Sequence, residues 1–167
     1  MNLNQLYLAF LLCIFNPLLS QGQEYRAGGF IGGFLADPNT LNLEATIDYT
    51  PNGAAFYFES GITLTAAVVD KQFQGPIATL PLNLCFAIGT KVIFEPVMGV
   101  YIRSNGHTGF GFGAGLGAAL GPKTQLFIRS TQIKELYTES NPRGGEDQKA
   151  SSYFILFRIG LKRRLKL

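Results

Sequence analysis

Apolar and polar residues alternate with a period of two along most of the chain after residue 23, and this pattern limits the possible folds more than any other feature. In residues 40–50, TLNLEATIDYT, the apolar residues occupy odd-numbered positions, and Asn42, Glu44 and Asp48 lie between them. A period of two places successive side chains on opposite faces of a β-strand. The alternation predicts eight strands, near residues 24–36, 40–50, 54–68, 76–88, 91–104, 109–121, 124–138 and 151–165.

The predicted strands are long, and the chain carries little charge. Ordinary strands have about 5–6 residues, whereas a tilted strand that crosses a membrane needs roughly 9–11. Charged residues make up 15% of the chain, against about 25% in an average soluble domain. Both features indicate that much of the outer surface faces something other than water.

Tight turns alternate with longer loops between the predicted strands, and only the first connection, around residues 37–39, breaks this trend. The turns lie at 51–53, 89–90 and 121–123, and the loops at 69–75, 104–109 and 138–151. Short periplasmic turns and longer extracellular loops are typical of outer-membrane barrels. The sequence therefore predicts an all-β fold, an eight-stranded antiparallel up-and-down transmembrane β-barrel. Both termini would lie in the periplasm.

The two faces of the predicted strands differ in chemistry. The polar faces carry a few charges of both signs, which can pair in an enclosed lumen: Glu44, Asp48, Glu59, Glu95, Arg103, Arg129 and Arg158. The apolar faces are nearly uncharged, as contact with lipid requires, and they include Leu80, Leu82, Leu84, Phe110, Phe112, Leu116, Ile155, Phe157 and Ile159. Side chains fill the interior of an eight-stranded barrel, so no open channel is expected.

Residues 109–121, GFGFGAGLGAALG, have two possible interpretations. Residues 113–118 fit the G-x-G-x-x-G/A dinucleotide fingerprint, but that motif needs a helix after it, and Gly121-Pro122 prevents one. A period of two instead predicts a strand whose glycines face the lumen and leave space for bulky neighbours. The predicted glycine stripe is Gly111, Gly113, Gly115 and Gly117, and the neighbours are Tyr101, Arg103, Phe127 and Arg129.

The ends of the chain and its single histidine suggest further assignments. An apolar run over residues 6–15 is too short to span a membrane and suits a signal peptide. We expect residues 1–22 to form this signal peptide and residues 23–167 to form the barrel domain.

His107, with Ser104 nearby, could belong to a lipid hydrolase, but a solvated loop histidine is the simpler interpretation. The basic segment 162–166, KRRLK, either binds anionic headgroups or is a strand end whose side chains reach the interface.

Four segments resemble the small outer-membrane β-barrel proteins of Gram-negative bacteria, in particular the PorT-like "outer membrane protein β-barrel domain" family. They are IATLPLNLCFAIG (77–89), PVMGVYI (96–102), TQLFIRSTQIKELYT (124–138) and YFILFRIGLKRRL (153–165). The resemblance implies an eight-stranded barrel of OmpX-like or OmpA-like shape in the outer membrane. It also implies membrane lipid, lipopolysaccharide and the outer-membrane assembly machinery as partners.

We expect a structural or interaction role, with loops presented at the outer surface and another envelope protein as a candidate partner. No catalytic residue, cofactor or metal site is predicted. No nucleic-acid partner is expected either, because the net charge is only +3 and the basic residues form no stripe. Three alternatives remain open: an accessory subunit of a larger secretion or transport complex in the envelope, an enzyme that modifies outer-leaflet lipid, and a soluble secreted barrel that binds an apolar ligand.

Overall fold

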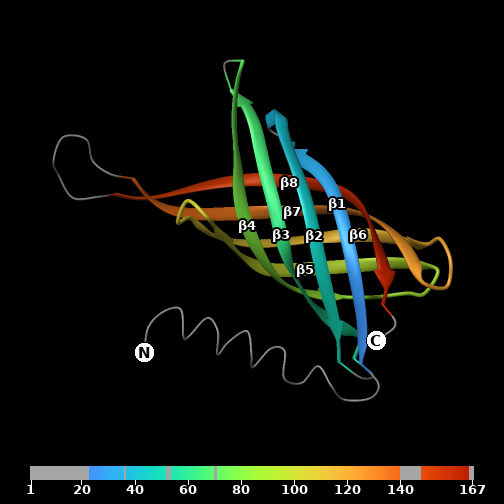
Figure 1. The fold of residues 1–167 in the computed structure, drawn as a ribbon. Coiled ribbons are helices and arrows are strands. Elements are labelled where there is room, and N and C mark those ends of the chain that lie inside the picture. Colours follow the sequence, from blue (N-terminus) through green and yellow to red (C-terminus); the bar gives the residue numbers. More distant parts are fainter. Residues whose placement is uncertain (1–22, 36, 52–53, 70, 140–147, 166–167) are drawn as a thin grey trace.

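Eight antiparallel strands follow one another along the chain and close into a barrel in the computed structural model (Figure 1). The structure describes residues 23–35, 37–51, 54–69, 71–139 and 148–165. The strands are β1 (Glu24–Phe34), β2 (Asp37–Thr50), β3 (Phe56–Val69), β4 (Gln72–Phe86), β5 (Val92–Arg103), β6 (Thr108–Ala119), β7 (Thr124–Glu139) and β8 (Gln148–Arg164). The predicted eight-stranded antiparallel barrel is therefore confirmed. The expected signal peptide, residues 1–22, lies outside the described residues.

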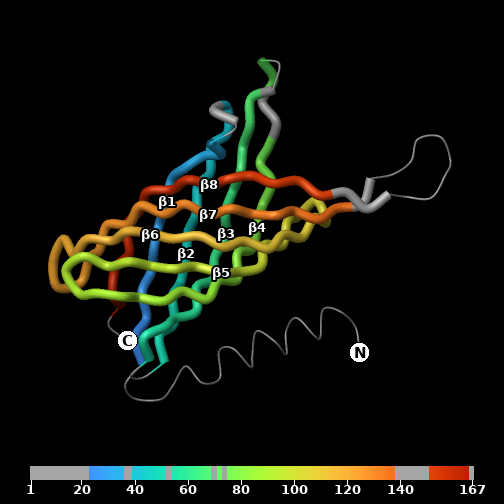
Figure 2. Tube along the Cα trace, turned by 180° about the vertical axis from the view of Figure 1, so that it is seen from behind, coloured from blue at the N-terminus to red at the C-terminus, as the bar shows by residue number. Residues whose placement is uncertain are grey.

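The barrel closes where β1 pairs with β8, from Arg26 opposite Arg164 to Phe34 opposite Leu156. With an even number of antiparallel strands, β1 begins and β8 ends at the same end of the barrel, which we call the terminal end. The strands on one side of the barrel cross those on the other at a steep angle (Figures 1 and 2), because closure requires tilted strands. No helix among the described residues is long and apolar enough to cross a membrane.

The expected alternation of short turns and longer loops is wrong at the β3–β4 hairpin. Residues 69–75 were expected to form a loop, but β3 continues to Val69 and β4 starts at Gln72. Lys71 adopts the left-handed conformation, with φ of 65°, and this lets the two strands reverse direction tightly. At β7–β8 the strands likewise reach Glu139 and Gln148, so much of the expected loop is strand. Residues 140–147 of that loop lie outside the described residues.

Side chains point inward and outward in strict alternation. Inward residues have even numbers on β1, β2 and β8 and odd numbers on β3 to β7. Large apolar side chains cover the outside: Phe112 is 65% exposed, Leu116 60% and Ile62 58%. All nine residues expected to face lipid lie on this outer surface. The protein thus has the reverse of the usual soluble arrangement, with most of its large apolar side chains outside.

Candidate functional site in the barrel lumen

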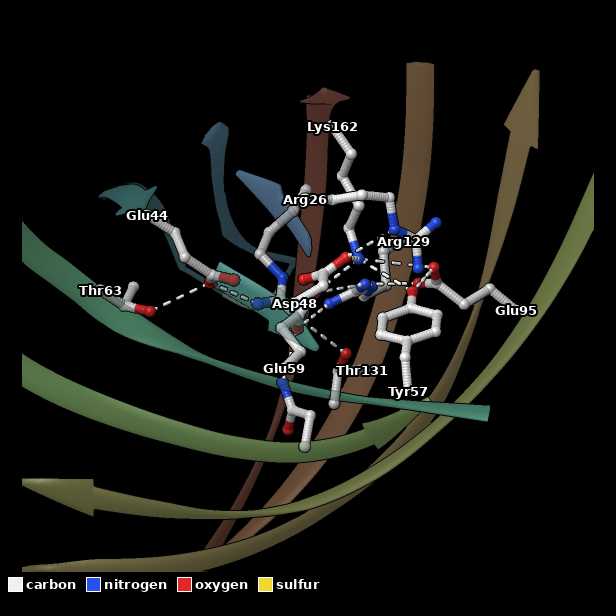
Figure 3. Close-up of polar contacts among 12 residues, drawn as sticks. Arg26, Glu44, Asp48, Tyr57, Glu59, Thr63, Glu95, Arg129, Thr131 and Lys162 are labelled. Carbon is white, nitrogen blue, oxygen red and sulfur yellow. Dashed lines mark hydrogen bonds and ion pairs between the residues drawn. The ribbon is translucent and has the colours of Figure 1, made fainter. Parts of the chain in front are cut away.

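Charged side chains from six strands meet at the centre of the lumen (Figure 3). The central cluster consists of Arg26, Asp48, Tyr57, Glu59, Glu95, Arg129 and Lys162, and the carboxylates, Arg129 and Lys162 are at most 1% exposed. Each member sits at an inward position of its strand, so the period of two alone brings these groups inside the wall. The barrel's closure then decides which of them meet.

Two cations organise the central cluster. Arg129 donates two hydrogen bonds to the Glu59 carboxylate, at 2.5 and 2.9 Å, and a further one to Glu95. The Lys162 Nζ lies 2.6 Å from Glu59, 3.0 Å from Asp48 and 3.6 Å from Glu95. Bidentate and charge-assisted bonds of this kind are the strong ones. They hold β3, β5, β7 and β8 together across the lumen.

Tyr57 links the cluster to its edge. Its hydroxyl accepts a hydrogen bond from Lys162 at 2.8 Å and donates one to Glu95. The Arg26 guanidinium lies 4.3 Å from the centre of the Tyr57 ring, and its Nε is 3.5 Å from Asp48. Aromatic faces attract cations at such distances. The Lys162 Nζ also lies 4.6 Å from the Tyr57 ring centre, so Tyr57 serves both as a hydrogen-bonding group and as a surface for two cations.

A second ion pair, Arg158 with Glu44, lies beside the central cluster. Glu44 also accepts a hydrogen bond from Thr63 at 3.0 Å, and Arg158 donates one to Thr131 at 2.9 Å. Across both groups four carboxylates face four cations: Glu44, Asp48, Glu59 and Glu95 against Arg26, Arg129, Arg158 and Lys162. Buried charges are tolerated when they are paired and hydrogen-bonded, and this balance provides the pairing.

A third group, the mouth cluster, lies at the end opposite the terminal end and consists of Arg103, His107, Glu135 and Ser152. The Glu135 carboxylate is 2.9 Å from Arg103 and 3.2 Å from His107 Nδ1, and it accepts a 3.4 Å hydrogen bond from Ser152. The His107 ring stacks on Tyr137, with centroids 4.8 Å apart. These groups keep some contact with solvent, since the side chains of Arg103 and His107 are 15% and 30% exposed.

The mouth cluster bears on two expectations. Arg103 was expected among the lumen charges, and at the end of β5 it does face the lumen, where it pairs with Glu135 rather than with the central cluster. His107 was expected to be a solvated loop residue, but Glu135 and Tyr137 hold it in place. Ser104, its suggested catalytic neighbour, accepts a hydrogen bond from the Ala78 backbone N–H at 3.2 Å. Among the described residues, no hydrogen bond joins Ser104 to His107.

The glycine stripe lies inside β6, on the lumen side, and no helix follows it. A Cβ added at Gly111 would lie 2.6 Å from the Tyr101 ring, and one at Gly117 would lie 2.6 Å from the Phe127 ring. The nearest atoms to Gly113 and Gly115 belong to the β7 backbone and to Glu95. Tyr101 and Phe127 therefore occupy the expected space, whereas Arg103 and Arg129, also expected there, are drawn away to carboxylates.

Sequence reasoning missed Lys162, Arg26 and Glu135. Lys162 belonged to a basic segment assigned to the membrane interface, yet it shares the even numbering of Arg158 on the same strand. Glu135 likewise shares the odd numbering of Arg129. Extending the alternation to the strand ends would have placed both inside.

Solved structures share this fold at low sequence identity. The de novo designed barrel TMB2.3 matches with a TM-score of 0.60 and 11% identity, over 89% of this chain and 100% of that one. A major outer membrane protein from Thermus thermophilus matches with 0.57 and 12%, over 87% and 100%. Neisserial surface protein A matches with 0.53 and 9%, over 86% and 96%. No protein-family model and no curated protein matches the chain, so these comparisons establish the similarity of fold.

Proposed function

We propose that this chain spans the outer membrane of a Gram-negative bacterium as a closed barrel with a structural or interaction role. Both termini would lie in the periplasm, and the hairpins at the opposite end would face outward. The observation that carries the proposal is the inverted arrangement of side chains: paired charges fill the lumen, and large apolar residues cover the outer wall. A lipid bilayer is the environment in which such a surface is stable.

The height of the apolar wall supports this placement. Charged side chains mark the two edges of this wall. At the mouth edge the exposed Lys134 lies 5.4 Å from the ring centre of Tyr153. At the terminal edge Arg163 pairs in register with Thr124. The ten residue steps from Thr124 to Lys134, at about 3.3 Å each and tilted by roughly 40°, span about 25 Å, which is the height of an outer-membrane barrel's apolar band. The described outward side chains between these levels are uncharged.

The filled lumen argues for a closed barrel rather than a pore. Phe127, Arg129, Arg158 and Lys162 are completely buried, and Tyr57 is 1% exposed. Cations also lie over the Phe30 ring, with Arg129 5.0 Å from its centre. The same contents weigh against the soluble alternative, because an apolar ligand would have to displace paired charges.

Heat-modifiable mobility on gels and membrane fractionation test the bilayer placement. We expect the full chain in the outer-membrane fraction, with an unheated band that migrates faster than the heated one. Recovery in the soluble periplasmic fraction without detergent would overturn the proposal. In planar bilayers the purified protein should give no stable conductance, and a steady open channel would contradict the closed lumen.

A pair of matched variants sharpens the placement. Leu116→Arg puts a charge near the middle of the apolar wall and should lower the stability of the folded state in bilayers by about 2–4 kcal/mol. Leu136→Arg, beyond Lys134, should lower it by only about 0–1 kcal/mol. Denaturant unfolding in lipid vesicles measures both, and equal effects would contradict the assigned membrane level.

The accessory-subunit and enzyme alternatives are tested separately. Co-purification in mild detergent with a second envelope protein would favour a subunit role, whereas an isolated monomer would count against it. Replacing Ser104 or His107 should leave the lipid A of the host unchanged if the chain is not a lipid-modifying enzyme.

A further inference from the structure

A groove runs along the outer faces of β1 and β2, between walls formed by β8 and β3. It has a volume of about 730 Å³, and a neighbouring hollow of about 440 Å³ continues it toward Leu35. The floor is low because Gly29 and Ala45 are small, while Ile62 and Leu161 stand on either side. The groove is open along its length, and its lining is almost wholly apolar.

The terminal end of this groove carries unpaired positive charge. Arg163 occupies the next outward position after Leu161 on β8, two residues further along, and it pairs in register with Ala27 of β1. Lys123, in the β6–β7 turn, lies opposite the next residue, Arg164, whose N–H donates a 2.8 Å hydrogen bond to the Lys123 carbonyl. Both side chains are exposed, and the part of the chain that the structure describes offers neither of them an ion pair. The nearby Glu24 is already engaged by Arg164 at 2.5 Å.

Two neighbouring residues of the basic segment, Lys162 and Arg163, face opposite sides of the barrel wall and therefore have different roles. Lys162 turns inward and is wholly buried in the central cluster, so it is unavailable to any headgroup. Arg163 occupies an exposed outward position and pairs in register with Ala27, near the start of β1. The Tyr25 and Tyr49 rings pack at 5.6 Å on β1 and β2 at the same end. Tyrosine and arginine together mark the level of lipid headgroups.

We propose that the groove binds one anionic glycerophospholipid of the periplasmic leaflet. An acyl chain lies over Gly29 and Ala45, and the phosphate meets Arg163. The inference rests on the membrane placement proposed above. Charge complementarity selects this occupant, because a zwitterionic lipid leaves net positive charge at the groove's end. A second copy with the same orientation in the membrane would bring like charges toward each other.

Native mass spectrometry of the full chain in mild detergent tests this proposal. The probes are phosphatidylglycerol and phosphatidylcholine with the same acyl chains, supplied in equal amounts. We expect the wild type to retain one phosphatidylglycerol in clear preference. Arg163→Gln should reduce that preference by about fivefold, while Lys91→Gln, which removes an exposed charge in the distant β4–β5 turn, should leave it unchanged.

A second pair of variants tests the groove itself. Ala45→Leu fills the floor and should reduce retention of both lipids, whereas Ala118→Leu, an equivalent change on the outer face of β6, should not. If the wild type still shows the heat-modifiable band but retains the two lipids equally, the lipid-binding inference is overturned and the proposed function is not. A dimer that Ala45→Leu abolishes would assign the groove to a second copy and would also overturn it. Failure to enter membranes would instead overturn the proposed function.

Discussion

The central cluster and the mouth cluster are both built from arginine, glutamate and neighbouring hydroxyl groups, yet they differ in burial. In the centre the Arg129, Lys162 and Glu59 side chains are completely buried, whereas at the mouth Arg103 and His107 remain partly exposed. Burial strengthens each attraction, and it raises the cost of leaving a partner alone. The same residue types should therefore be essential to folding in one place and nearly dispensable in the other.

Removing the central lysine should have the largest effect. Lys162→Met leaves Asp48, Glu59 and Glu95 with too little positive charge, and we expect it to lower the free energy of unfolding by about 3–5 kcal/mol. Urea unfolding in detergent micelles, followed by gel mobility, measures this change. Lys123→Met deletes the same charge from an exposed turn and should change stability by less than about 0.5 kcal/mol. Similar losses in both variants would remove the contrast between buried and exposed charge.

The second ion pair allows a double-mutant cycle. Arg158→Met should cost about 3 kcal/mol because it leaves Glu44 buried without its cation. Adding Glu44→Gln removes the stranded charge, so the double variant should be more stable than the sum of the single changes predicts. We expect a coupling of about 1–3 kcal/mol. Strictly additive losses would mean that the pair does not act as a unit.

Packing against the glycine stripe should have an intermediate effect. Gly117→Ala pushes a methyl group into the ring of the fully buried Phe127, and overpacking of this kind costs about 1–3 kcal/mol. Gly121→Ala is the matched control, because its Cβ would meet nothing within 4 Å. The same unfolding experiment compares the two variants. A neutral Gly117→Ala would show that Phe127 can move aside.

The mouth cluster should give the smallest effect. Glu135→Gln weakens its contacts to Arg103 and His107, and we expect a loss of about 1 kcal/mol or less. Raising the salt concentration should reduce this difference, because partly exposed pairs are screened, whereas the loss caused by Lys162→Met should hardly change. A large, salt-independent loss at Glu135 would make the mouth equivalent to the centre.

The sequence was sufficient to predict the strands, and it predicted the inward and outward faces wherever the alternation is regular. It failed where a local rule competed with the alternation. The Val-Asp-Lys segment at residues 69–71 reads as a loop, although the left-handed conformation of Lys71 turns the chain within a few residues. The basic residues 162–164 read as one charged patch, although their side chains alternate across the wall.

The alternation of apolar and polar residues determined the barrel wall by itself, because a period of two is a local property of an extended chain. It predicted six of the buried charges, since they occupy inward positions, but not their partners. Lys162 and Glu59 are 103 residues apart in sequence, and Arg158 and Glu44 are 114 apart. Only the tilt and closure of the barrel bring such residues to the same depth in the lumen, and this is why the pairing of the charges was decided by the tertiary structure.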